Sequence, residues 1–175
     1  MKERPILFST EMVKALLDGR KTQTRRIVKG FSPEAIHFSV GSDQDANCPF
    51  GKIGDQLWVR ESFGTKIRNV GGTPHESFAY IATNSNEPVK WKPAIQMSRS
   101  ACRLVLEITN IRVERLQDIS EEAATAEGMI ADDDYCAEEY FSMFWNKRYG
   151  WAEKGWNANP WVWVVEFKVI QGGKP

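Results

Sequence analysis

The sequence has few of the residues that build metal sites and disulfide frameworks. Its 175 residues include only two histidines, His37 and His75, and three widely spaced cysteines, Cys48, Cys102 and Cys136. Neither the histidines nor the cysteines have the spacing of metal ligands, and both histidines fall in predicted loops. An odd number of separated cysteines is typical of the reducing cytoplasm. We therefore expect a cytoplasmic protein that needs no metal and no other cofactor.

Long apolar runs and an excess of charge of one sign are also absent. No stretch approaches the ~18 apolar residues of a membrane span, and the charged first residues differ from the apolar core of a signal peptide. Lys and Arg number 23, as do Asp and Glu, so the net charge is zero. A balance of this kind argues against tight, non-specific binding of duplex DNA. We expect neither a membrane nor duplex DNA as a partner.

The charges are nevertheless unevenly distributed. Residues 1–30 carry eight basic and three acidic side chains, whereas residues 118–139 carry nine acidic side chains and no basic one. The acidic run is either a solvated helix face or a wall that faces a small basic site.

Composition and periodicity predict one globular α+β domain over residues 1–175. Hydrophobic residues make up 42% of the chain and charged residues 26%, and no repeat or linker divides it. The apolar spacing predicts helices over residues 9–19, 120–126 and 134–148, and strands over residues 22–28, 56–63, 77–83, 101–113 and 161–169. A one-residue shift in the alternation at Thr109–Asn110 predicts a β-bulge. Residues 30–50 and most of 64–100 are predicted loops.

The densest polar cluster spans Gly19 to Arg26, where the first helix passes into a strand. Its four cations repel one another, and Lys21 is the one that can readily lose its proton. A lysine in this state can act as a general base towards a hydroxyl, and Thr22 and Thr24 are close in sequence. Lys21 and Thr24 would point to opposite faces of an extended strand, so they meet only if the chain still turns between them. A solvated basic edge strand explains the same residues without chemistry.

Several blocks of sequence together resemble the ASCH family of PUA-like domains. The blocks are Gly19-Arg20-Lys21-Thr22-x-Thr24-x-Arg26, Gly54-Asp55-x-Leu57-x-Val59, a helix that begins after Ser120 and ends at Glu127-Gly128, and Val164-x-Glu166-Phe167. The resemblance implies an α+β fold with a PUA-like small curved β-barrel and helices between the strands. It also implies a protein that handles RNA or a modified nucleoside. Residues 30–50, 64–100 and 129–158 look like expansions relative to the smallest members.

Within that family, the sequence is similar to bacterial amidohydrolases that remove the acyl group from N4-acetylcytidine. The resemblance implies Lys21 as proton acceptor, Thr24 as nucleophile and Glu127 as proton donor. Glu121 and Glu122 lie on the same predicted helix and are alternatives to Glu127. The implied partner is a modified nucleoside or an RNA-borne cytidine. A non-catalytic module that binds RNA or a modified base is the alternative.

Four further residues are candidates for substrate binding. Arg26 matches a position of the family motif, and we infer a role in holding the oxyanion or the pyrimidine carbonyl. Trp58 shares a predicted strand face with Arg60 and can stack on an unpaired base. Glu61 is an unusual charged residue on the apolar face of the same strand.

The predicted loops carry apolar residues, Phe38, Phe50, Trp91 and Ile95, that either wall a wider acyl pocket or only cover the ends of the barrel.

Overall fold

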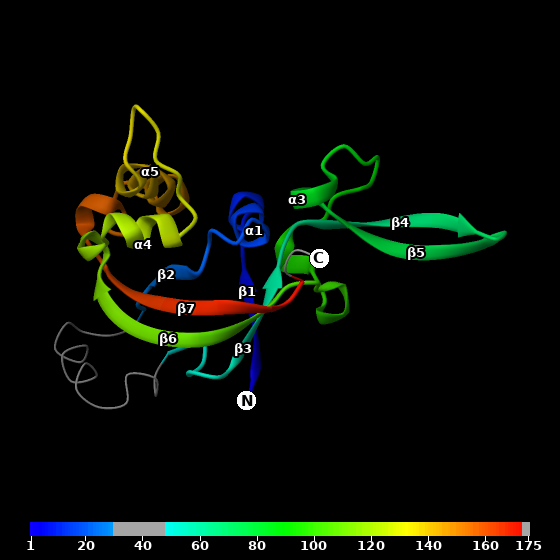
Figure 1. Cartoon of the computed structure of the whole chain (residues 1–175), viewed down its shortest axis with the longest axis horizontal. Coiled ribbons are helices and arrows are strands. Elements are labelled where there is room, and N and C mark those ends of the chain that lie inside the picture. The colour runs from blue at the N-terminus through cyan, green and yellow to red at the C-terminus, as the bar shows by residue number, and fades with distance from the viewer. Residues whose placement is uncertain (30–47, 173–175) are drawn as a thin grey trace.

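The computed structural model describes residues 1–29 and 48–172, and these residues form two sheets (Figure 1). The larger sheet has the strand order β1-β3-β6-β7-β2, and the smaller one pairs β4 with β5. The strands are β1 (Glu3–Leu7), β2 (Gln23–Ile27), β3 (Gln56–Arg60), β4 (Phe63–Val70), β5 (Thr73–Tyr80), β6 (Val105–Arg115) and β7 (Trp161–Gln171).

The large sheet is mixed and curved. Strand β1 runs parallel to β3, and the other pairs are antiparallel. The register of β6 against β7 shifts between Ile108 and Asn110, which confirms the bulge predicted at this position. Both long strands bend across the molecule in Figure 1, as expected for a bulged pair.

Strands β1 and β2 are the two edges of this sheet, and no backbone ladder joins them in the part of the chain that the structure describes. The Arg26 side chain connects the edges instead, because its Nη2 donates a hydrogen bond of 3.1 Å to the backbone oxygen of Leu7. The predicted α+β class is therefore confirmed. The curved sheet is closed at this seam by a side chain and not by paired backbone.

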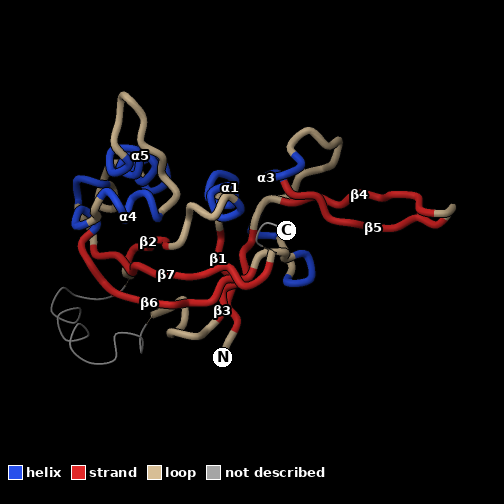
Figure 2. The backbone as a smooth tube through the Cα atoms, viewed as in Figure 1, coloured by secondary structure: helices blue, strands red, loops and turns tan. Residues whose placement is uncertain are grey.

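The three predicted helices begin and end largely where the sequence predicts, whereas residues 81–84 form a short helix at the end of a predicted strand. The helices are α1 (Thr10–Leu17), α3 (Ile81–Asn84), α4 (Glu121–Ala126) and α5 (Ala137–Tyr149). Ser9 Oγ accepts from the Met12 amide and Ser120 Oγ accepts from the Ala123 amide, so a serine caps the N-terminus of α1 and of α4. Helices α1, α4 and α5 lie on the same side of β6 and β7 (Figure 2).

Strand β7 carries a hydrophobic core on each face. The first core includes Ile6, Phe8, Leu16, Leu57, Leu106, Trp163, Val165 and Phe167. The second includes Leu116, Phe141, Trp145, Val162 and Val164. Successive β7 residues thus point into different cores, which is why the strand is apolar at consecutive positions.

Strand β2 is antiparallel to β7 and inherits this two-sided burial. Thr24 and Arg26 lie opposite Val165 and Trp163 of the first core, whereas Arg25 lies opposite Val164 of the second. Directly opposed residues of paired strands share a face. The polar residues of the predicted cluster therefore lie between the two cores.

Two further features differ from the sequence prediction. Residues 3–7 form a strand that the sequence did not predict, because two charged residues, a proline and two adjacent apolar residues show no alternation. Residues 63–70 form strand β4 of a hairpin that extends away from the large sheet (Figure 1). This part of 64–100 is therefore regular structure and not loop. Phe38 lies outside the described residues.

No helix among the described residues has the length and apolar character needed to cross a membrane.

Candidate functional site

The junction between α1 and β2 packs against the end of α4. The Lys21 amide donates to Ala15 O at 3.0 Å, and the Thr22 amide donates to Ala126 O at 2.8 Å. Gly128 ends the α4 segment at φ +100°, and a Cβ there would lie 2.7 Å from the Ala15 Cβ. Glycine at this position thus permits the close approach that places Lys21 beside Glu127.

Lys21 and Glu127 form a buried ion pair. Lys21 Nζ donates to Glu127 Oε2 at 2.7 Å, to Glu127 O at 2.9 Å and to Gln23 O at 2.7 Å. The two side chains are 0% and 1% exposed. Burial lowers the pKa of Lys21 to about 8, although the charge of Glu127 acts in the opposite direction. A lysine with this pKa can exchange its proton near neutral pH.

The second carboxylate oxygen of Glu127 faces Arg25. Arg25 Nη1 lies 3.3 Å from Glu127 Oε1, and Arg25 Nη2 donates to Glu114. Arg25 is not among the predicted site residues. Alternation along a strand predicts that its side chain points to the opposite face from Arg26, but only the pairing of β2 with β7 shows that this face is buried.

The other acidic residues of 118–139 serve mainly in local structure. Glu121 accepts from the Ala137 and Glu138 amides at 2.7 and 3.1 Å, which caps the start of α5. Asp132 accepts from the Asp134 and Tyr135 amides. Glu127 is the acidic residue of this run that is buried against the basic cluster.

Thr24 pairs with Arg26. Arg26 Nη1 donates to Thr24 Oγ1 at 2.6 Å, so the hydroxyl keeps its own proton for another acceptor. Lys21 Nζ and Arg26 Cζ lie 5.6 and 5.5 Å from the centroid of the Phe8 ring. The Lys21–Glu127 and Thr24–Arg26 pairs therefore adjoin one aromatic side chain.

Lys21 and Thr24 are buried, so the alternative of a solvated basic edge strand is wrong for these two residues. Their exposed fractions are 1% and 0%. The physical reason is the position of β2, whose two faces are covered by the two hydrophobic cores.

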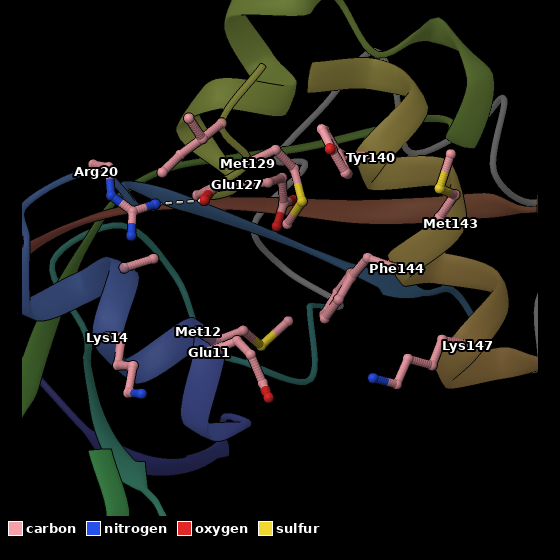
Figure 3. Close-up of a pocket in the computed structure, with 13 residues that line it drawn as sticks. Glu11, Met12, Lys14, Arg20, Glu127, Met129, Tyr140, Met143, Phe144 and Lys147 are labelled. Atoms are coloured by element: carbon pink, nitrogen blue, oxygen red, sulfur yellow. Dashed lines mark hydrogen bonds between the residues drawn. The ribbon is translucent and has the colours of Figure 1, made fainter. Parts of the chain in front are cut away.

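Two cavities flank this group. The first, which we call the apolar cavity, has a volume of about 490 Å³ and lies between α1 and α5 (Figure 3). Glu127 reaches its wall, and Arg20 Nη1 donates to Gly128 O beside it at 2.6 Å. Its apolar lining consists of Met12, Ala15, Met129, Ile130, Met143 and Phe144.

The second cavity, which we call the basic cavity, has a volume of about 440 Å³ and lies between the edges β1 and β2 and the end of α5. Its cationic lining consists of Arg26, Lys29, Arg60, Arg148 and Lys154. Phe50, Ile27 and Tyr149 add apolar surface. Neither Lys21 nor Thr24 is among the described residues that line either cavity.

The remaining predicted binding residues lie on or just after β3. The Arg60 guanidinium lies 5.5 Å from the Trp58 ring centroid, as their shared face predicted. Glu61 is buried and pairs with Arg103 at 2.8 and 2.9 Å, and Arg103 stacks on Tyr80 at 4.0 Å. Of Trp58, Arg60 and Glu61, only Arg60 lines one of the two cavities described above.

Among the described residues, His, Cys, Asp and Glu side chains form no group of three that could hold a metal ion.

Comparison with known proteins supports the fold. The structure aligns with protein EF3133 from Enterococcus faecalis V583, of the family model DUF984, with a TM-score of 0.50 and 11% identity over 98% of this chain and 82% of that one. It also aligns with an ASCH domain from Lactobacillus crispatus JV V101, with a TM-score of 0.46 and 16% identity over 97% and 80%. The first alignment shows that this chain shares the fold of EF3133. At these identities the similarity concerns the fold alone.

No family model matches the sequence, and no curated protein is similar to it.

Because the Lys21–Glu127 pair is buried, we expect its two side chains to be strongly coupled in their contributions to the free energy of unfolding. Lys21→Met leaves Glu127 buried without its closest cation and should lower the free energy of unfolding by about 3–5 kcal/mol. The double variant Lys21→Met/Glu127→Leu should lose much less stability than the two single variants lose together, because it leaves no buried charge without its partner. Denaturant unfolding of the four proteins measures this coupling.

The half-exposed pair Lys168–Glu107, whose side chains are 60% and 32% exposed, is the control. Its coupling should be below about 1 kcal/mol. Equal coupling energies in the two pairs would contradict the expectation that burial makes the Lys21–Glu127 pair the more strongly coupled one.

Proposed function

We propose that this protein is a metal-free amidohydrolase that removes the acyl group from N4-acetylcytidine or a related N4-acylated cytidine. The observation that supports the proposal most directly is the buried Lys21–Glu127 pair, in which the lysine has a pKa of about 8. A hydroxyl nucleophile, Thr24, lies three residues further along the chain and is oriented by Arg26. These are the residue types and the order that the sequence resemblance implies.

In the first half-reaction, Lys21 acts as the base and Glu127 acts as the acid. Transfer of the shared proton across the 2.7 Å hydrogen bond converts the ion pair into neutral Lys21 and protonated Glu127. Thr24 Oγ then attacks the amide carbonyl, and its proton passes to Lys21. The C–N bond breaks while Glu127 gives its proton to the departing amine of cytidine, and the acyl group stays on Thr24 as an ester.

The second half-reaction reverses these roles. The pair is now Lys21 with an extra proton and Glu127 as a carboxylate. Glu127 takes a proton from water as the water attacks the ester, and Lys21 returns a proton to Thr24 Oγ as the acyl group leaves. Each turnover consumes one water and restores the starting pair, so no metal is required by the balance. Arg26, which donates to the Thr24 hydroxyl, is positioned to stabilise the oxyanion that develops as Thr24 attacks.

Substrate reaches Thr24 only when a covering side chain moves, because the threonine is fully buried. Arg26 is the link between Thr24 and open space, since it both bonds to the hydroxyl and lines the basic cavity. We therefore infer that the acylated base approaches through the basic cavity and displaces the Arg26 guanidinium from the Thr24 hydroxyl towards the carbonyl oxygen.

The same burial favours a second candidate function. A threonine and a lysine without exposed surface also suit a module that binds RNA or a modified base, in which the Lys21–Glu127 pair only supports the fold. The two functions are separated by turnover.

Incubation with N4-acetylcytidine in the presence of EDTA should release cytidine. Thr24→Ala should abolish this activity, whereas Thr24→Ser should keep part of it because the hydroxyl remains. Chromatography of the products measures the rate, and circular dichroism checks that each variant is folded. A fully active Thr24→Ala would exclude the nucleophile role, and a wild-type protein that binds but does not hydrolyse would favour the binding module.

The pH dependence of kcat/KM tests the shared proton. The active pair holds one proton, and the pair loses that proton with an apparent pKa of about 8. The rate should therefore be level around neutral pH and fall about tenfold per unit above about pH 8. A rate that instead rises up to pH 8 would show that neutral Lys21 acts alone and that Glu127 is not the proton donor.

A further inference from the structure

The basic cavity has a concentration of positive charge that the proposed reaction does not use. Five cations line it, from β2 and the residue just after it (Arg26 and Lys29), from the end of β3 (Arg60), from the last turn of α5 (Arg148) and from the following segment (Lys154). No acidic side chain is among its described lining residues. A cavity of one sign attracts a ligand of the opposite sign.

These cations are not neutralised by neighbours within the described parts of the chain. None of the five takes part in an ion pair there, although ten such pairs occur elsewhere in the same residues. Arg60 Nε is buried without a hydrogen-bond partner. Burial lowers the pKa of Arg26, and the like charge of Arg148 adds to this effect, whereas Tyr149 and Glu127 act in the opposite direction.

The shape of the basic cavity adds a second requirement. Phe50, Ile27 and Tyr149 give it apolar surface beside the cations, and its volume of about 440 Å³ lies in the range of pockets for small organic ligands. A bare inorganic anion would leave this surface uncovered. A ligand with a flat ring at one end and an anionic group at the other would contact both.

We propose that the basic cavity binds the phosphate of a nucleotide, so that this protein prefers a phosphate-bearing N4-acylated cytidine over the free nucleoside as its substrate. The inference rests on the proposed function and names its substrate class. The phosphate lies among Arg60, Arg148 and Lys154, with the base towards Arg26 and hence towards Thr24. Arginine binds phosphate oxygens with two parallel hydrogen bonds, which gives orientation as well as affinity.

Binding of unreactive ligands tests the cavity without turnover. Cytidine 5′-monophosphate should bind at least about tenfold more tightly than cytidine, because its phosphate contacts the cations of the basic cavity. Its affinity should also fall more steeply as the salt concentration rises, because salt screens these charges. Isothermal titration calorimetry measures both affinities. Equal affinities, or no binding of the monophosphate, would overturn the proposal.

Arg148→Gln removes one cation from the cavity and should reduce the ratio of the two affinities by about tenfold. Arg68→Gln is the matched control, since Arg68 is exposed on strand β4 of the hairpin and outside the cavity. A ratio that falls equally in both variants would indicate a general effect of charge and would also overturn the proposal.

Two further arms separate this proposal from the proposed function and identify the source of the phosphate. If N4-acetylcytidine is hydrolysed as fast as its 5′-monophosphate, the enzymatic function holds and the phosphate site fails. If nothing is hydrolysed but the monophosphate binds through Arg148, the site holds and the enzymatic function fails.

A short oligocytidylate that binds more tightly than the monophosphate would assign the phosphate to RNA, and weaker binding would assign it to a free nucleotide.

Discussion

The buried contact between Lys21 and Glu127 is the constraint on which the site depends. Removing two charges from water is costly, and the cost is recovered only when the partners are close and their remaining donors and acceptors are satisfied. Lys21 meets this condition with three short hydrogen bonds, two of them to backbone oxygens. The same bonds fix the start of β2 against the end of α4, so the fold and the proposed chemistry share one set of contacts.

Strand β2 transmits this constraint to the rest of the molecule. Its alternate side chains enter two different cores, so Arg25 supports Glu127 on one face while Arg26 supports Thr24 on the other. Arg26 also connects the two edges of the curved sheet through Leu7. The open edge between β1 and β2 is where the basic cavity lies. A seam closed by a side chain, and not by a backbone ladder, can bind a ligand without breaking strand pairing.

Local features were predictable from the sequence, and non-local ones were not. The caps at Ser9 and Ser120 and the bulge at Thr109 follow from short-range chemistry and alternation, and the structure has all three. The motif resemblance also singled out Lys21 and Glu127, which lie 106 positions apart in the sequence and form a buried ion pair. The burial of Thr24 could not be predicted, because it depends on which strands flank β2 and on the second core beyond them. Strand β1 could not be predicted either, because its five residues do not alternate between polar and apolar and its pairing with β3 is parallel and distant in sequence.

Proton transfer at this site requires that Lys21 can give up its proton near neutral pH. Heteronuclear NMR of lysine side chains can follow its Nζ, with the Lys21→Arg variant providing the assignment. We expect a titration midpoint near pH 8, because burial outweighs the attraction of Glu127. A midpoint near the ordinary lysine value of about 10.4 would contradict this expectation, since Lys21 would then be a permanent cation that holds the fold together and takes no part in proton transfer.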